Sequence, residues 1–154
     1  MSVAHVVAAG LALLTGTYAW LTPRGTRRHR RVGALYVASM VGVEATAFRL
    51  YYLFGHFGLV HWGAVGSGLL LLLGVGAVVG RPAGWPAWRQ WHYVGMGGSL
   101  LGLYTALVVE STYRLFTATY FWWSTLGVAS VVLLGGAALL YRQFPAGQPR
   151  AQVH

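Results

Sequence analysis

Residues 57–79 read FGLVHWGAVGSGLLLLLGVGAVV, an apolar run whose one ionisable side chain is His61. A helix needs about 20 apolar residues to cross the hydrocarbon core of a bilayer. Other stretches of the chain have the same character. The sequence therefore predicts an all-α membrane protein, a five-helix transmembrane bundle. We expect one transmembrane domain over 1–141, with spans at about 3–21, 32–54, 57–79, 91–111 and 118–141, and a cytoplasmic tail over 142–154.

The composition excludes several classes of site. The chain has 154 residues, of which 56% are hydrophobic and 8% are charged, against about 25% charged in soluble domains. It contains no Cys, which excludes disulfides, iron–sulfur clusters and thiol nucleophiles. It contains no Lys, which excludes a Schiff base and a P-loop. No Ser, His and carboxylate stand at a hydrolase spacing, so we expect neither a hydrolase nor a group-transfer enzyme.

The positive charge indicates topology rather than nucleic-acid binding. Eleven basic residues, all Arg, face two acidic ones, for a net charge of +9. Most of the Arg lie between or after the apolar stretches, in three regions that five spans put on one side. The positive-inside rule then predicts an outer N-terminus and a cytoplasmic C-terminus. These arginines are Arg24, Arg27, Arg28, Arg30, Arg31, Arg81, Arg89, Arg142 and Arg150.

The 22 glycines are expected to serve close helix packing, since small residues let helix backbones approach in lipid. Gly76-x-x-x-Gly80 and Gly98-x-x-x-Gly102 have the required spacing, as does the run from Gly63 to Gly68. Such faces pack within one chain or between copies. A homo-oligomer or a larger membrane complex is therefore one expected partner besides the lipid bilayer.

Ionisable groups inside spans are costly and are functional candidates by default. Glu44 lies ten residues before Phe54, at about 15 Å from the outer end of its span. Glu110 and Arg114 have the i,i+4 spacing of a helical salt bridge. With Arg49 they predict an intramembrane polar network. The first functional hypothesis is accordingly a small accessory, assembly or transport protein without a cofactor, in which His61 joins this network.

The histidines support a second hypothesis. His5 and His61 are expected near the outer leaflet, and His29 and His92 near the inner one. Imidazole is a good ligand of haem iron. The alternation of the two pairs along the helices resembles the layout of di-haem b-type cytochromes. That likeness implies a haem-b protein that passes electrons between leaflets or to a quinone.

Arginines would then bind the haem propionates. Arg49 and Arg114 are the expected outer partners, and Arg28 or Arg89 the inner ones. Two simpler interpretations stay open. Histidines near helix ends are often merely interfacial, and His92 with Met96 at i,i+4 would suit copper.

A further resemblance covers about 130 residues. The chain carries an early His before A-L-x-x-G, then G-x-x-x-H-R-x-x-G-x-x-Y-x-x-x-M, then a helix that opens with His and holds Met and Ser. It thereby resembles a family of bacterial predicted membrane proteins of unknown function. The resemblance implies a multi-helix fold in the bacterial inner membrane, and it draws attention to His29 and Arg30. The matching residues are His5, Ala12, Leu13, Gly16, Gly25, His29, Arg30, Gly33, Tyr36, Met40, His92, Met96 and Ser99.

Overall fold

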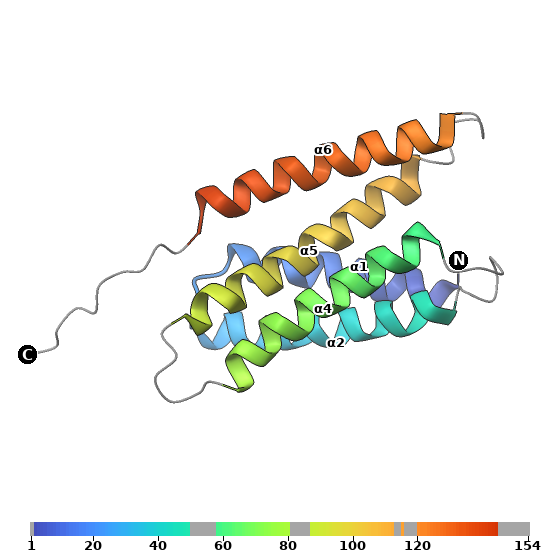
Figure 1. The fold of residues 1–154 in the computed structure, drawn as a ribbon. Coiled ribbons are helices and arrows are strands. Elements are labelled where there is room, and N and C mark those ends of the chain that lie inside the picture. The colour runs from blue at the N-terminus through green and yellow to red at the C-terminus, as the bar shows by residue number, and fades with distance from the viewer. Residues whose placement is uncertain (1, 50–57, 81–86, 113–114, 116–119, 145–154) are drawn as a thin grey trace, which may run out of the picture.

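The computed structural model describes residues 2–49, 58–80, 87–112, 115 and 120–144. Over these residues the fold is all-helical, with long helices that run side by side (Figure 1). The prediction of an all-α protein is therefore confirmed. The helices are α1 (Val3–Leu21), α2 (Arg27–Arg49), α4 (Leu59–Val79), α5 (Trp88–Thr112) and α6 (Phe121–Arg142).

Four of the helices form the body of the molecule. Helix α1 packs on α2, α2 on α4, α4 on α5, and α5 back on α1. Helices α2 and α5 are thus diagonal to each other, as are α1 and α4. Helix α6 packs on α5 along the outside (Figure 1). The buried core draws on all four inner helices: Ala12, Tyr36, Met40, Val43, Leu71, Leu100 and Leu103.

Helix α2 begins earlier than expected. The apolar pattern predicts a start near residue 32, whereas the helix begins at Arg27. The Thr26 hydroxyl accepts a hydrogen bond from the backbone N–H of His29 at 3.1 Å, which is the bond of a helix N-cap. Gly25 supplies the turn before it, with a φ of 81°. The arginine run and His29 therefore lie on a helix rather than in the loop that was expected.

Four of the described helices are long and apolar enough to cross a membrane: α1, α5, and the parts of α4 and α6 over His61–Val79 and Thr125–Arg142. Helix α2 is not among these four. Its charges explain the difference, because it opens with four arginines in five residues and contains Glu44. Its 23 residues still make it about 34 Å long, enough for the core of a bilayer.

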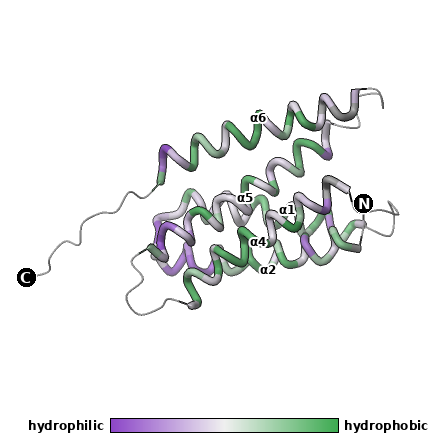
Figure 2. The backbone as a smooth tube through the Cα atoms, in the orientation of Figure 1, coloured by the Kyte–Doolittle hydropathy of each residue, from purple (hydrophilic) through white to green (hydrophobic). Residues whose placement is uncertain are grey.

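The hydrophilic residues gather at one end of the molecule. The start of α2, the start of α5 and the end of α6 share that end (Figure 1), where Figure 2 shows the strongest hydrophilic colouring. We call it the basic end, since seven described arginines lie there. The predicted placement of the arginine regions on one side of the bundle is met for these residues: Arg24, Arg27, Arg28, Arg30, Arg31, Arg89 and Arg142.

Glycine brings α4 and α5 into backbone contact. A Cβ added to Gly95 would lie 2.6 Å from the carbonyl oxygen of Leu70, and one added to Gly74 would lie 2.8 Å from the backbone nitrogen of Met96. Gly98 and Gly102 also face α4, as predicted, against Leu70 and Ser67. At Gly63, Gly66 and Gly76 the expected packing is not found among the described residues, because an added Cβ would have no described neighbour within 4 Å.

Candidate functional site

Two histidines meet inside the bundle at the basic end. His29 is on α2 and His92 on α5, the two helices that face each other across the diagonal. Their ring centroids are 6.4 Å apart and the ring planes cross at 79°. Both side chains are half-buried. The structure thus brings together the pair that the sequence assigned to the inner leaflet.

Each of these rings is held by a backbone carbonyl from a neighbouring helix. Nδ1 of His29 is 3.1 Å from the carbonyl oxygen of Ala19, in α1. Nδ1 of His92 is 2.8 Å from the carbonyl oxygen of Gly74, in α4. A carbonyl oxygen only accepts, so Nδ1 must donate in both rings. In the neutral rings the lone pair is then on Nε2, which is directed away from the carbonyl.

All four inner helices therefore shape the site. The carbonyl of Gly74 belongs to the segment where α4 and α5 come into backbone contact, and this contact puts it within reach of His92. A hydrogen bond from the second ring nitrogen to a carbonyl is the usual support of a metal-binding histidine, because it fixes both the tautomer and the ring orientation. His29 and His92 share this kind of support.

Aromatic and cationic side chains continue the site toward the end of the bundle. The ring of Tyr93 lies 5.1 Å from that of Trp20 and 6.1 Å from that of Phe144. Its hydroxyl donates to the carbonyl of Leu140 at 3.0 Å. The Arg24 guanidinium stacks over the Tyr93 ring at 4.9 Å. A positive charge is thus fixed beside the residue that follows His92.

The second predicted pair has a different geometry. Nδ1 of His5 is 2.8 Å from the hydroxyl oxygen of Thr46. That hydroxyl directs its proton to the carbonyls of Gly42 and Val43, so its oxygen accepts from His5. Nδ1 of His61 instead accepts from the backbone N–H of Gly58 at 3.1 Å. The described residues show no ring contact between His5 and His61, and neutral His61 carries its proton on Nε2.

A chain of polar groups crosses the core between the two predicted histidine pairs, His29 with His92 and His5 with His61. The Tyr36 hydroxyl is 2.7 Å from the Ser99 hydroxyl, with both side chains almost fully buried. Ser67 donates to the carbonyl of Ser99 at 3.4 Å, and its hydroxyl is also within hydrogen-bonding reach of the Glu44 carboxyl group. These contacts join α2, α5 and α4 through side chains that the bilayer cannot hydrate.

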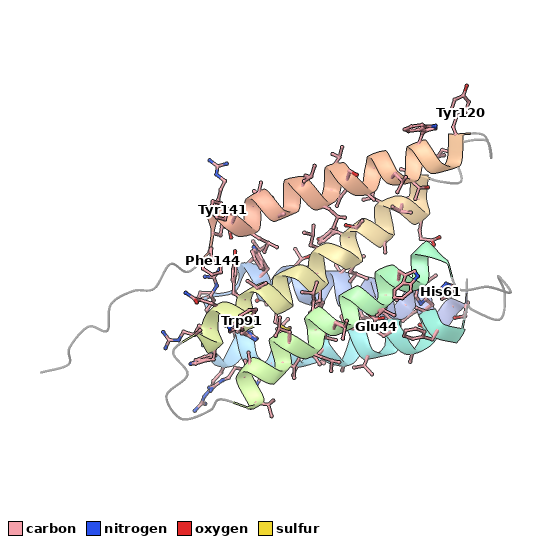
Figure 3. The ribbon with its side chains drawn as sticks, viewed as in Figure 1. Glu44, His61, Trp91, Tyr120, Tyr141 and Phe144 are labelled. Carbon is pink, nitrogen blue, oxygen red and sulfur yellow. The ribbon has the colours of Figure 1, made fainter. Side chains whose placement is uncertain are left out.

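Glu44 stands at the far end of this chain of groups, toward the end of the molecule opposite the basic end (Figure 3). Its carboxyl group rests on Gly68, where an added Cβ would lie 3.7 Å from the carboxyl carbon. One carboxyl oxygen, Oε2, is buried without a hydrogen-bond partner among the described residues. Glu44 is thus an incompletely satisfied polar group inside a helix bundle, and such groups usually mark function.

The other members of the predicted polar network lie apart or outside the described residues. Glu110 is half-buried near the end of α5. Arg49 ends α2, and its side chain is outside the described part. Arg114 is outside it too, so the Glu110–Arg114 pair stays a prediction. Met96, the partner proposed for His92 in a copper site, packs against the core and α4.

Sequence reasoning from charge missed the hydroxyl groups of Tyr36, Ser67 and Ser99. A neutral hydroxyl in an apolar helix gives no periodic or charge signal. The resemblance pattern does contain Tyr36 and Ser99, together with Ala12 and Met40, and these four are the most deeply buried of the core and polar side chains described. That pattern was the signal that could have identified Tyr36 and Ser99.

Comparisons with protein-family models, curated proteins and solved structures found no match to this chain. The resemblance to a family of bacterial membrane proteins therefore stays a prediction. Fold and site rest on the chain's own geometry, and the plain conclusion is an all-helical protein with four described helices suited to a membrane and a histidine pair at its basic end.

Proposed function

We propose that this protein is a membrane redox protein that holds one haem b between His29 and His92. The observation that carries the proposal is the close pair of rings in edge contact, each anchored at Nδ1. Metal–imidazole bonds are about 2 Å long, so one ion would fit between two imidazole rings whose centres are about 6 Å apart. The measured 6.4 Å agrees with that spacing.

The number of ligands also favours haem over a bare ion. The described residues contain no group of three or more His, Cys, Asp or Glu side chains that could hold a metal ion. A structural zinc site needs four protein ligands and a catalytic one three. Haem would need only two side-chain ligands, which His29 and His92 would provide, and it would supply one-electron chemistry when bound.

The chain's own residues would position and tune that group. The carbonyls of Ala19 and Gly74 hold the rings in one tautomer and make Nε2 more basic. An arginine at the basic end would pair with the haem carboxylates, and of the two candidates, Arg28 or Arg89, Arg89 is the one proposed. Arg24, fixed over Tyr93, adds a third cation on the same side. The outer pair, His5 and His61, is not proposed as a second haem site.

The proposed setting is the bacterial inner membrane, with all five helices spanning, the N-terminus outside and the basic end in the cytoplasm. Seven of the described arginines lie at the basic end, and this supports the orientation. Helix α2 packs between α1 and α4, which supports its inclusion as a fifth span. A quinone or a second membrane redox protein would be the electron partner.

The test is an absorbance spectrum of the purified protein, oxidised and dithionite-reduced, after expression with a haem precursor. We expect a Soret band and the α band of six-coordinate haem on reduction. His29→Ala and His92→Ala should each remove these bands. His5→Ala and His61→Ala are matched controls and should keep them.

Two outcomes would overturn the proposal: an unaltered chain without a Soret band, or bands that depend on His5 and His61 instead. His29→Gln and His92→Gln keep a donor for the carbonyls while removing the ligand. They separate loss of haem from loss of fold, which is followed by thermal unfolding in detergent. Copper without haem in the purified protein would favour the copper interpretation.

A second candidate function rests on Glu44. We propose that, without haem, Glu44 would serve as a proton-exchanging group of a transport-type protein, as the buried Oε2 without a described partner suggests. The test is proton flux into liposomes containing the protein, driven by a potassium gradient and read with a pH-sensitive dye. Glu44→Gln should stop the flux, while Glu110→Gln, an equal loss of charge, should not. Unchanged flux in Glu44→Gln would exclude this function.

A further inference from the structure

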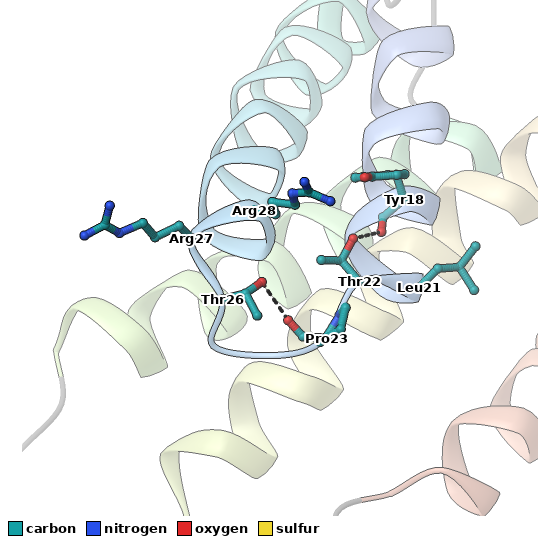
Figure 4. A pocket seen from close by; sticks show the side chains of 7 residues that line it. All are labelled: Tyr18, Leu21, Thr22, Pro23, Thr26, Arg27 and Arg28. Atoms are coloured by element: carbon teal, nitrogen blue, oxygen red, sulfur yellow. Dashed lines mark hydrogen bonds between the residues drawn. The ribbon is translucent and has the colours of Figure 1, made fainter.

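An open groove lies between the end of α1 and the start of α2, at the basic end (Figure 4). Its volume is about 580 Å³, within the range of small-molecule sites. The groove lies where α1, one of the helices suited to a membrane, ends. It is lined by Tyr18, Leu21, Thr22, Pro23, Thr26, Arg27 and Arg28.

Two guanidinium groups are the charged hydrogen-bond donors of the groove. The Thr22 hydroxyl donates to the carbonyl of Tyr18 at 2.7 Å, and the Thr26 hydroxyl donates to the carbonyl of Pro23 at 2.9 Å. Both hydroxyl protons are thus committed within the chain. Arg27 and Arg28 are exposed and are not engaged in this way. Two exposed guanidinium groups favour an anionic ligand on the polar side of the groove.

The acidic side chains of the protein do not supply that anion. Its two acidic side chains are Glu44 and Glu110. Glu44 is sixteen residues beyond Arg28 on the same helix, a distance of about 24 Å. Glu110 lies toward the opposite end of α5. The first turn of α2 contains no acidic residue, so its arginines lie unbalanced beside the positive end of the helix dipole. Neither acidic side chain therefore balances the charge of Arg27 and Arg28.

The apolar side of the groove restricts what kind of anion fits. Leu21 is 76% exposed and Tyr18 is 52% exposed, and both stand on the last turn of an apolar helix. An inorganic phosphate would leave these side chains uncovered. A phospholipid offers a phosphate to Arg27 and Arg28 and an acyl chain to Tyr18 and Leu21.

We propose that this groove is a specific site for an anionic phospholipid. The headgroup phosphate bonds the guanidinium groups of Arg27 and Arg28, and the first part of an acyl chain lies along Leu21 and Tyr18. A zwitterionic lipid such as phosphatidylcholine carries its own cation and is disfavoured beside two arginines. The site does not depend on haem, so the protein can be tested without it.

The experiment measures thermal unfolding of the full chain in neutral detergent with added phosphatidylglycerol, phosphatidylcholine or inorganic phosphate. We expect phosphatidylglycerol alone to raise the Tm, by on the order of 5 °C. The double variant Arg27→Gln/Arg28→Gln should lose this rise. The double variant Arg89→Gln/Arg142→Gln removes the same charge from the basic end outside the groove and should keep it.

Three results would overturn the proposal. If both double variants lose the rise in Tm equally, the effect is general charge attraction. If inorganic phosphate raises the Tm as much as phosphatidylglycerol does, the groove is a free-anion site. If phosphatidylcholine raises it equally, the site does not select the headgroup. Should the groove variant not fold, a photoreactive phosphatidylglycerol decides with the unaltered chain. The label must map to the peptide over residues 18–28, and a label confined to other helices contradicts the site.

Discussion

At the scale of single residues, the direction of the hydrogen bond at Nδ1 decides whether Nε2 of a neutral histidine carries a proton or a lone pair that can bind a metal. His29 and His92 both donate from Nδ1 to carbonyls, whereas His61 accepts there from Gly58. Sequence spacing made the two pairs equivalent. The difference between them arises from helix contacts that bring the carbonyls of Ala19 and Gly74 to the rings, and spacing along the chain does not report these contacts.

Exchanging one ligand of the proposed haem should change its potential. His92→Met keeps a ligand for iron but replaces a strong donor by a thioether, which stabilises the ferrous state. We expect the variant to bind haem with a reduction potential higher by on the order of 100 mV. Spectroelectrochemical titration measures the shift. His61→Met should leave the potential unchanged, and a shift of equal size there would contradict the assignment.

The hydrogen bond between Tyr36 and Ser99 should contribute measurably to stability. Ser99→Ala leaves the Tyr36 hydroxyl without its 2.7 Å partner in a fully buried position. We expect a loss of about 1 kcal/mol in the free energy of unfolding, measured by denaturant titration in mixed micelles. Ser111→Ala, whose exposed hydroxyl bonds its own helix at Leu107, is the control and should cost nearly nothing. Equal losses of unfolding free energy in the two variants would mean that the Tyr36–Ser99 hydrogen bond does not contribute to stability.

At the scale of elements, the contact between α4 and α5 depends on the absence of side chains at Gly74 and Gly95. Gly95→Ala forces a methyl group against the backbone of α4, where nothing flexible can yield. We expect a loss of about 1–3 kcal/mol in the free energy of unfolding. Gly76→Ala has open space around the added methyl group and should be neutral or slightly stabilising. Thermal unfolding of the two variants checks the contrast, and equal stability would refute the close contact.

Helix positions could be predicted from hydrophobicity alone, because apolar runs of the right length report membrane-suited helices. The expected run at 3–21 coincides with α1, and that at 57–79 differs from α4 by two residues at its start. Helix α2 departs most, since Thr26 caps it ahead of an arginine run that hydropathy assigns to a loop. Which glycines touch a neighbour was not predictable, because Gly76 and Gly74 have the same sequence character but face different surroundings.

At the scale of the whole molecule, the proposed orientation puts the start of α1 outside and the end of α6 in the cytoplasm. The chain contains no cysteine, so single introduced thiols report topology without background. Ser2→Cys should react with an impermeant maleimide on intact spheroplasts, and Gln143→Cys should react only after they are opened. Labelling of both from outside would rule out the five-span arrangement.

Which helices face each other in the bundle could not be predicted from the sequence. The positive-inside rule needs only the order of charges, so it places the arginine regions on one side. It does not say that α2 faces α5 across the diagonal, which is what unites His29 with His92 and Tyr36 with Ser99. Those pairings follow from three-dimensional packing, chiefly the glycine contact between α4 and α5.

Among the described residues, α6 packs chiefly on α5, and this has a consequence for biogenesis. The ribosome completes α1, α2, α4 and α5, with every residue of the histidine pair and of the polar chain, before it starts α6. In the proposed five-span arrangement, the translocon would release these four helices into the lipid while the last segment is still being translated. Helix α6 then joins as a late addition along one flank, and its own sequence is constrained by α5 and by lipid rather than by the interior.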